Sequence, residues 1–304
     1  MASIAIIFSY KTGLKAKRRL EKIKKYLELK NVSYDLVRPD RNETVETLSS
    51  RLCEQMYNTV VVIGGDGSIN DAINGIMNAK SRHKDFAFGI IPSGTANDFS
   101  KFWGVQSKDY KLAIDSIVKR KVRKIDLGVC SYISDNKTNR RFFLNCVNIG
   151  LGAKMVELAK STKVITGSKR LSNFIAMIGQ IFERKSFKLV FHTDSETLYE
   201  KVMSVCVGNT TGYGQTPNAV PYNGMLDMSV ITRPEWWQIF EGFWLLEKGK
   251  FLNYKNVNPY RIWNVRFDDI GKAKVSLDGR IIHEKIGMPL SVSVLKETIP
   301  LIIP

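Results

Sequence analysis

Two glycine-containing segments carry residue types that suit phosphate binding. In the first, Gly64-Gly-Asp-Gly-Ser-Ile-Asn70 directly follows the apolar, mostly β-branched run Val60-Val-Val-Ile63. Glycines let an anion come close to the main chain, and a helix that starts there adds the positive end of its dipole. Asp66 could hold a metal ion or a proton. The segment therefore predicts a phosphate-binding turn after a buried strand, with an ordinary glycine turn as the alternative.

The second segment, Phe88-Gly-Ile-Ile-Pro-Ser-Gly-Thr-Ala-Asn-Asp-Phe99, has a similar organisation. Its apolar run breaks at Pro92, and the hydroxyl residues and glycine that follow are typical of phosphate-binding loops at the carboxyl end of a strand. Asn97 and Asp98 could equally cap the next helix. The two segments lie about 25 residues apart with a helix-length stretch between them. This spacing predicts neighbouring strand–helix units that line one cleft.

The elements that must position these loops follow two different periodicities. From residue 3 to about 127, predicted strands such as Ile4–Phe8 and Ser33–Val37 alternate with helices such as Thr44–Met56. This alternation predicts a parallel sheet with helices on both faces and a ligand at the carboxyl ends of its strands. After Asp126, short runs of alternating hydrophobicity predict antiparallel strands in a sandwich or irregular barrel.

The predicted fold is therefore α/β followed by β. A parallel α/β nucleotide-binding domain is expected at residues 1–127 and a β-rich antiparallel sandwich domain at residues 128–304, with the extreme C-terminus able to pack back on the first domain. Helical interruptions of the second domain are expected at Ala153–Lys160, Leu171–Arg184 and Glu235–Glu247. The last contains aromatic residues at helical spacing, Trp236, Phe240, Phe243 and Trp244. They could form core or a wall that faces lipid.

Together with Lys124-Ile-Asp-Leu-Gly128, the two glycine segments resemble those of the soluble bacterial diacylglycerol kinases, a family shared with sphingosine and ceramide kinases and more distantly related to NAD kinases. The resemblance extends over nearly the whole chain, and the Pro92–Phe99 loop favours lipid kinases over NAD kinases. It implies an active site in the cleft between the two domains, ATP and Mg²⁺ as cofactors, and a lipid hydroxyl as the phosphate acceptor.

The resemblance also implies roles for individual residues. The nucleotide contacts implied are Ser9, Thr12, Gly13, Gly64, Gly65, Asp66, Gly67, Ser68, Asn70, Ser93, Gly94, Thr95, Asn97 and Asp126. Asp66 and Asp98 are the residues expected near the catalytic Mg²⁺, and Asp66 and Asp278 are the expected catalytic residues.

Two departures from the family pattern concern nucleotide and metal. The family's first strand is followed by asparagine and proline, where this chain has Ser9 and Tyr10, while the later hydroxyl–glycine pair remains as Thr12-Gly13. The hydroxyls can still form hydrogen bonds, so nucleotide contact is expected to be weakened. Where bacterial members hold a structural magnesium with an aspartate, this chain has Asn223. A neutral amide oxygen there predicts lower Mg²⁺ affinity.

The third departure concerns the catalytic base. The family carries aspartate–glycine–glutamate near the C-terminus, with the glutamate as base, and this chain has Asp278-Gly-Arg280. A guanidinium cannot accept a proton. Asp278 could deprotonate the acceptor hydroxyl, or it could serve only as a turn residue in an Asp-Gly hairpin. Glu284 lies slightly further along and could substitute for the missing glutamate.

Composition limits the compartment and the partners. The 304 residues suit two domains, 44% hydrophobic and 25% charged residues suit a soluble protein, and no apolar run reaches the ~20 residues of a membrane span. The chain start is expected to be a strand and not a signal peptide. The four cysteines show no zinc-binding spacing, which favours a reducing cytoplasm.

The charge favours an anionic partner, because 46 Lys and Arg against 29 Asp and Glu give a net charge of +17. Much of the excess is spread out, with one segment around Lys15–Lys25 and another at Lys119–Lys124. In the first, an apolar stripe makes the basic residues a solvated helix face. No nucleic-acid-binding signature is present. Electrostatic, peripheral attachment to the inner face of the membrane is therefore expected, and a homodimer is left open.

Two functions from different classes remain after these observations. The first is an ATP-dependent kinase that phosphorylates a hydroxyl of a lipid such as diacylglycerol or of a lipid-like alcohol. The second is a catalytically silent nucleotide- or lipid-binding protein on the same scaffold, which Arg280 and Asn223 favour. An NAD kinase is a weaker third reading. The sequence does not name the acceptor lipid.

Overall fold

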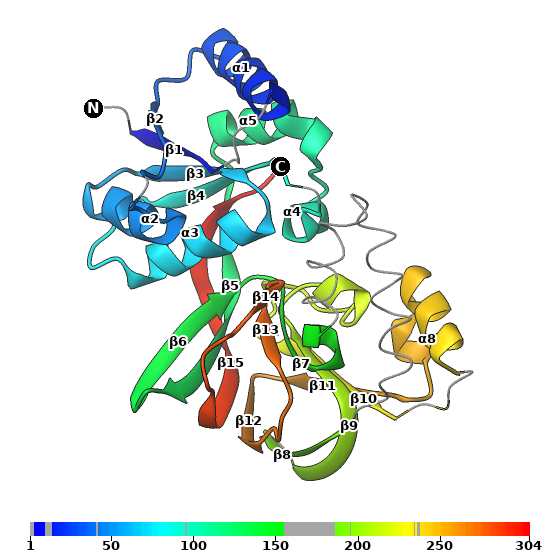
Figure 1. The fold of residues 1–304 in the computed structure, drawn as a ribbon. Coiled ribbons are helices and arrows are strands. Elements are labelled where there is room, and N and C mark those ends of the chain that lie inside the picture. Colours follow the sequence, from blue (N-terminus) through cyan, green and yellow to red (C-terminus); the bar gives the residue numbers. More distant parts are fainter. Residues whose placement is uncertain are drawn as a thin grey trace. The chain divides into compact units, whose positions relative to one another are not determined.

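The computed structural model describes residues 3–9, 14–40, 42–94, 96–154, 186–194, 196–233, 235 and 238–304 (Figure 1). The chain divides into two compact units. Unit 1 comprises Met1–Ile125 together with Glu297–Pro304, and unit 2 comprises Asp126–Lys296. Each unit has its own hydrophobic core and is described by itself.

Unit 1 is built on a parallel sheet. Its strands follow the order β2 (Asp35–Val37), β1 (Ile4–Phe8), β3 (Thr59–Gly64), β4 (Ala87–Pro92) and the end of β15 (Gly287–Ile302). All of these pairs are parallel, and β15 joins through Leu301 opposite Phe88. Because β2 and β3 lie on opposite sides of β1, the strand order reverses there. In open α/β sheets such a reversal is where ligands bind, at the carboxyl ends of the strands.

Helices cover both faces of this sheet (Figure 1). Helices α1 (Leu14–Leu29) and α5 (Tyr110–Lys119) lie on one face, and α2 (Val45–Glu54) and α3 (Asp66–Asn78) lie on the other, while the short α4 (Asp98–Phe102) and the 3₁₀ turn η1 (Ser107–Asp109) connect β4 to α5. On α1, Leu20, Ile23 and Leu27 are buried in one cluster with sheet residues. Lys17, Lys22 and Lys25 are exposed on the other side of the helix, as amphipathicity requires.

Helices α2 and α3 approach each other most closely at a glycine. A Cβ placed on Gly75 of α3 would lie 2.0 Å from the main-chain oxygen of Glu46 in α2. Thr44 caps α2 through a reciprocal pair of bonds with Thr47, which fixes the start of the helix next to this contact. The absence of a side chain at position 75 is therefore what allows the two helices to pack on the same face.

Unit 2 is built from antiparallel strands. They are β5 (Val122–Ser134), which begins in unit 1, β6 (Lys137–Phe143), β7 (Cys146–Gly150), β8 (Phe187–Thr193), β9 (Thr197–Gly208), β10 (Leu226–Thr232), β11 (Val257–Ile262), β12 (Asn264–Asp269), β13 (Val275–Leu277), β14 (Arg280–Ile281) and the first part of β15. Long β9 pairs with β8 along its first half and with both β7 and β10 along its second half. Helix α8 (Gln238–Glu247) and the 3₁₀ turns η2 (Gly212–Gly214) and η3 (Phe251–Asn253) lie in the connections.

The core of unit 2 lies between these strands. The rings of Phe191 on β8 and Phe267 on β12 pack with centroids 5.7 Å apart. The ring of Phe143 lies over Gly128, where an added Cβ would be 2.0 Å from a ring carbon. Since Gly128 and Phe143 are opposite each other on β5 and β6, the glycine provides the space that the aromatic ring fills.

This architecture confirms the fold class predicted from the sequence, an α/β domain followed by a β-rich one. The predicted helix at Glu235–Glu247 is α8, which begins at Gln238. Most of the predicted helix at Ala153–Lys160 and all of the one at Leu171–Arg184 lie outside the described residues. Within the described ranges, no helix is both long enough and apolar enough to cross a bilayer.

Replacing Gly75 with alanine should destabilise unit 1. Alanine is the better helix former by ~1 kcal/mol, but its methyl group would meet the main chain of α2, and overpacking of this kind costs about 1–3 kcal/mol. Urea unfolding of Gly75→Ala against wild type measures the difference, with Asn78→Ala at the exposed end of α3 as the control. A stability equal to or above that of wild type would show that the two helices can move apart at no cost.

Candidate functional site

The carboxyl ends of three strands of unit 1 lie in register. Phe8 on β1 is opposite Ile63 on β3, and Gly64 at the end of β3 is opposite Pro92 at the end of β4. Main-chain hydrogen bonds continue this pairing by one residue, because Ser9 N donates to Ile63 O over 3.1 Å and Ser93 N donates to Gly64 O over 2.8 Å. The two glycine segments and Ser9 therefore start side by side at one edge of the sheet.

The two glycine loops touch through their main chains. A Cβ on Gly65 would lie 2.9 Å from Gly94 Cα, and a Cβ on Gly94 would lie 2.6 Å from Gly65 Cα. Real side chains essentially never come this close, so any residue larger than glycine at either position would push the loops apart. The structure thus brings together the two segments that the sequence singled out separately.

The loop after β3 leads directly into the amino terminus of α3. Gly65 is the N-cap and Asp66 is the first residue of this 13-residue helix. Main-chain N–H groups at such a terminus, together with the helix dipole, favour an anion. Ser9 Oγ and Ser68 Oγ lie 2.8 Å apart beside this terminus, and Gly65 and Ser68 are only half-buried. These groups can donate hydrogen bonds to phosphate oxygens.

Asp66 links the starts of two helices. Its Oδ1 accepts a hydrogen bond of 3.3 Å from Phe99 N, in the first turn of α4. No group of three or more His, Cys, Asp and Glu side chains that could hold a metal is found among the described residues. Mg²⁺ bound to a nucleotide takes most of its ligands from phosphates and waters, with one or two carboxylates from the protein. Asp66 fits that requirement. Asp98, also expected near the metal, is half-buried and lies 3.4 Å from Lys101 Nζ.

Asn97 closes the loop after β4 upon itself. Its Oδ1 accepts from Gly94 N over 2.9 Å, and its Nδ2 donates to Gly94 O over 2.8 Å and to Ser107 Oγ over 2.7 Å. The residue has a left-handed backbone (φ 50°) and is buried together with Ser93. Asn97 therefore fixes the conformation of the loop. Gly94 is half-buried and is thus more accessible than Ser93 and Asn97. The nucleotide contacts predicted for Asn97 and Ser93 stay predictions.

Arg19 of α1 stabilises the main chain on both sides of the same loop. Its guanidinium donates to Pro92 O over 2.8 Å and also to Ser107 O. Nothing in the sequence separates Arg19 from the neighbouring basic residues, for which the pattern predicts a solvated helix face. The one available signal was its position next to the buried Leu20, at the border of the apolar stripe.

The remaining predicted contacts of unit 1 are distributed unevenly. Asn70 is buried within α3, where its main-chain oxygen accepts from Asn74 Nδ2 over 2.9 Å, and Gly67 lies in the first turn of the helix. Thr12, Gly13 and Thr95 lie outside the described residues.

In unit 2, Asp278 forms a tight hairpin turn. Asp278 and Gly279 have positive φ angles of 44° and 76°, and they connect Leu277 of β13 to its partner Arg280 of β14. This is the two-residue hairpin that an Asp-Gly pair favours. The Asp278 carboxylate accepts three main-chain hydrogen bonds, from Leu144 N at 2.8 Å, Asn145 N at 2.9 Å and Cys146 N at 3.0 Å.

The carboxylate of Asp278 therefore holds the turn between β6 and β7. It is 6% exposed, and accepting a proton from a substrate would weaken these bonds, because it removes the negative charge that strengthens them. Asn145 in that turn extends the network, because its Oδ1 accepts from Thr210 Oγ1 over 2.5 Å and from Gly212 N over 3.2 Å. The sequence had not singled out Asn145. The role of Asp278 as a base stays a prediction that this geometry does not favour.

Asp126 and Asn223 contribute to one turn of unit 2. Asp126 is 1% exposed; its N donates to Pro221 O over 2.7 Å and its Oδ2 accepts from Gly224 N over 2.7 Å. Asn223 Oδ1 accepts from Met225 N over 3.0 Å. The amide oxygen expected at the structural magnesium position is thus used within its own turn, and these residues do not fit a strong Mg²⁺ site.

Glu284, expected as a possible substitute for the family's glutamate, already has a partner. Glu284 Oε2 accepts a hydrogen bond of 3.1 Å from Tyr132 Oη. Burial, with the nearby Glu284 carboxylate as the second cause, raises the pKa of Tyr132 to about 12, so the phenol keeps its proton at neutral pH. Arg280 is exposed at the start of β14.

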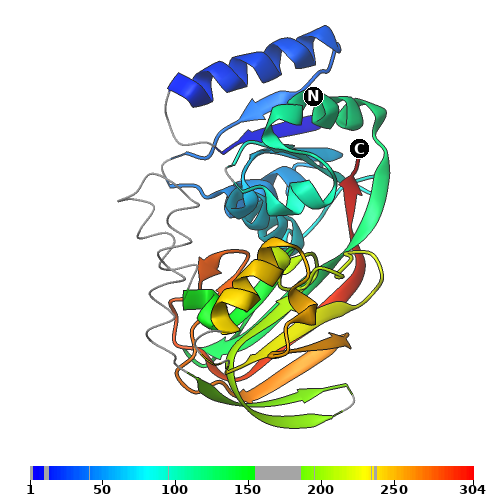
Figure 2. The same cartoon turned by 90° about the vertical axis from the view of Figure 1, so that its right-hand side faces the viewer.

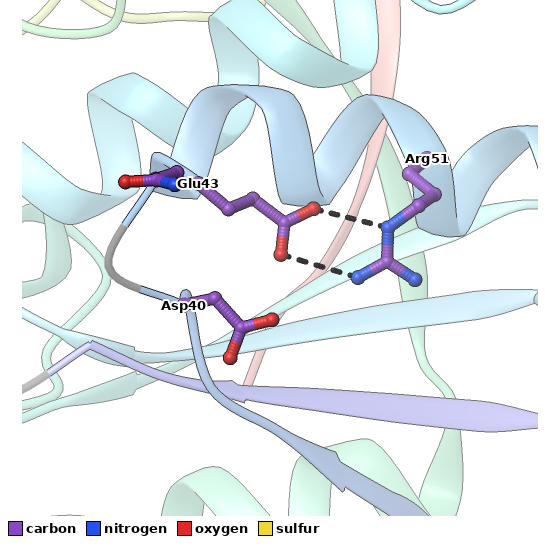
Figure 3. A pocket seen from close by; sticks show the side chains of 4 residues that line it. Asp40, Glu43 and Arg51 are labelled. Carbon is purple, nitrogen blue, oxygen red and sulfur yellow. Dashed lines mark hydrogen bonds and ion pairs between the residues drawn. The ribbon is translucent and has the colours of Figure 1, made fainter.

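Unit 1 also has a surface pocket that none of its predicted site residues lines (Figure 3). It is lined by Asp40, Asn42, Glu43 and Arg51. Arg51 already forms a two-pronged ion pair with Glu43, at 3.0 and 3.2 Å. Since Arg51 is already paired and no predicted site residue lines the pocket, the glycine loops remain the candidate site.

Comparison with known families divides the chain in the same way as its periodicity does. The diacylglycerol kinase catalytic domain matches residues 3–130, and the YegS C-terminal NAD kinase beta sandwich-like domain matches residues 145–303. A diacylglycerol kinase of Bacillus subtilis is 22% identical over 229 residues, which cover 73% of this chain and 71% of that relative. One from Mycobacterium tuberculosis is 26% identical over 215 residues, covering 69% and 66%.

Solved structures show the same fold. A diacylglycerol kinase from Bacillus anthracis superimposes with a TM-score of 0.69 at 17% identity, covering 99% of this chain and 96% of that one. The yeast NADH kinase bound to NADH superimposes with a TM-score of 0.56 at 12% identity, covering 98% and 82%. With both domains matched in order, the chain belongs to the soluble diacylglycerol kinase family of lipid kinases.

Proposed function

We propose that this protein is an ATP-dependent kinase that transfers the γ-phosphate to a hydroxyl of a lipid such as diacylglycerol or of a lipid-like alcohol. The observation that carries the proposal is the main-chain contact between Gly65 and Gly94, which places two glycine loops and Asp66 at one edge of the sheet. ATP and Mg²⁺ are the proposed cofactors. Family membership supports the reaction class, and the acceptor is proposed only as a class.

The proposed roles follow from what phosphoryl transfer requires. The reaction depends mostly on positioning and charge neutralisation, with little covalent chemistry for the protein. The amino terminus of α3, with Ser9 and Ser68, would hold phosphate oxygens. Asp66 would hold the Mg²⁺ that accompanies ATP, and that ion would neutralise charge on the phosphates. Arg19 and Asn97 would keep the second loop in the shape that accepts them.

Arg280 stands where the family has its glutamate base, and we expect this difference to lower the rate without changing the class of reaction. A lost general base typically costs on the order of 10² to 10⁴ in rate. In a loose transition state, the acceptor hydroxyl can lose its proton late, so a kinase can turn over without a strong base. We therefore assign Arg280 to an anionic group of the acceptor or to a phosphate oxygen, which a guanidinium binds well. Asp278 is proposed as a positioning residue for the turn at 144–146.

Incubation of the protein with labelled ATP, Mg²⁺ and an extracted lipid pool should yield a labelled phospholipid, and the product would identify the acceptor.

Asp66→Asn should lower ATP affinity in the presence of Mg²⁺ by about tenfold or more, because it removes the metal-binding charge while keeping the shape of the side chain. Asp85→Asn is the control, because it removes the same negative charge from an exposed residue outside the candidate site. No transfer to any lipid, together with intact ATP binding, would favour the catalytically silent protein instead.

Arg19→Ala should raise KM for ATP by roughly tenfold, because the loop after β4 loses two hydrogen bonds from a charged donor. Arg19→Lys should restore part of the affinity, since a lysine can reach only one of the two carbonyls well. Steady-state kinetics over a range of ATP concentrations separates KM from kcat. If KM is unchanged while stability falls, Arg19 has only a structural role.

Asp278→Asn should destabilise unit 2 by ~1–3 kcal/mol, since one of the carboxylate oxygens becomes an NH₂ group that faces main-chain N–H donors. Arg280→Glu should leave stability unchanged and abolish transfer. Thermal unfolding and a fixed-substrate kinase assay measure the two effects. A rise in activity in Arg280→Glu would contradict the role given to the arginine and show that the chain had lost a base that can be restored.

A further inference from the structure

Helix α8 of unit 2 exposes two large aromatic side chains on one face. Phe240 and Trp244 are each 57% exposed, and their spacing of four residues places them one above the other. Of the two alternatives left open for the aromatic stripe, a place in the core is excluded for these two residues. Trp236 and the side chain of Phe243 lie outside the described residues.

The opposite face of α8 is fixed to the rest of unit 2. Leu245 is buried in a cluster with Phe251, Tyr254 and Val257, and a Cβ on Gly242 would lie 2.9 Å from the Tyr254 ring. The helix therefore cannot turn its aromatic face inward without losing these contacts. Figure 2 shows α8 lying across the strands of unit 2.

Basic residues accompany the exposed aromatic pair. Lys248 Nζ lies 5.8 Å from the centroid of the Trp244 ring, and Lys250 and Lys255 are exposed just beyond the helix. Two acidic side chains are exposed among those that the structure describes here, Glu241 within the helix and Glu235 just before it, and the helix ends at Glu247, whose side chain is not described. Positive charge is therefore in excess only beyond the carboxyl end of α8, next to Trp244. This excess of positive charge agrees with the net charge of +17 of the whole chain. An aromatic ring with lysines beside it suits a boundary between apolar and negatively charged material.

We propose that this α8 face, formed by Phe240, Trp244 and Lys248, docks on the interface of an anionic lipid bilayer. The aromatic rings enter the headgroup region, where tryptophan is favoured, and the lysines bind lipid phosphates. The inference rests on the proposed function, because a kinase that phosphorylates a lipid must reach it in a membrane. It adds the surface through which the enzyme reaches its substrate.

A protein partner fits this face less well. A specific protein–protein interface buries about 800 Å² on each side, with good shape complementarity. Two aromatic side chains on one convex helix of ten residues supply only a small part of that area. A bilayer needs no complementary shape, and its negative charge matches the lysines.

Vesicle sedimentation with the full chain tests the proposal. Wild type should bind vesicles of phosphatidylcholine mixed with phosphatidylglycerol, and added salt should release it because it screens the lysines. The double variant Phe240→Ser/Trp244→Ser should bind at least about tenfold more weakly. Trp263→Ser, at a tryptophan that is 55% exposed elsewhere in unit 2, should bind like wild type. Lys248→Ala should bind more weakly than Lys137→Ala, which removes the same charge from the β5–β6 hairpin.

The same variants separate this inference from the proposed function. If the double variant keeps ATP binding and phosphorylates a water-soluble short-chain diacylglycerol, but fails on long-chain lipid in vesicles, both proposals stand. If wild type has no kinase activity yet loses vesicle binding in the double variant, only the proposed function fails. Equal vesicle binding by wild type and the double variant overturns the inference. So does a wild-type dimer that the double variant converts to a monomer, because the face would then bind a second copy.

Discussion

The main-chain contact between Gly65 and Gly94 is the constraint on which the candidate site depends. It requires β3 and β4 to end at the same level, which the pairing of Gly64 with Pro92 ensures, and it requires both positions to lack a side chain. Parallel pairing alone would bring the two loops to one edge of the sheet, but it would leave space between them. The glycines remove that space, so the amino terminus of α3 and the loop after β4 form one continuous main-chain surface.

Maintaining that surface depends on polar groups that do not face a ligand. Asn97 closes the loop after β4 with hydrogen bonds in both directions to Gly94, and Arg19 holds it from α1. Groups of this kind keep a binding site in its working shape before the ligand arrives, which lowers the cost of binding. Unit 2 uses the same principle at Asp278, whose carboxylate organises three consecutive main-chain N–H groups.

The sequence was sufficient for the fold and for the two loops, because both depend on local patterns. Strand periodicity, the position of glycine after an apolar run and the change of period near Asp126 are all readable along the chain. The supporting contacts were not readable in this way. Arg19 reaches residues more than 70 positions away, and Asp278 binds a turn more than 130 positions earlier. In the sequence, Arg19 resembles any other surface cation, and Asp278 resembles an ordinary turn residue.

The different environments of two aspartates explain how the chemistry can be divided. Asp66 is half-buried at a helix amino terminus and accepts a hydrogen bond of 3.3 Å from Phe99 N, a setting that suits a metal carried by a nucleotide. Asp278 is buried, and its carboxylate accepts hydrogen bonds from three main-chain N–H groups at 2.8–3.0 Å, so it stabilises the protein's own backbone. On the proposed function, the groups assigned in unit 1 act on the phosphate side of the reaction, and position 280 supplies an arginine in place of a base. On the same proposal, the acceptor hydroxyl would be activated mainly by where it is held, which would give the delivery of the lipid from the membrane a larger share in setting the rate.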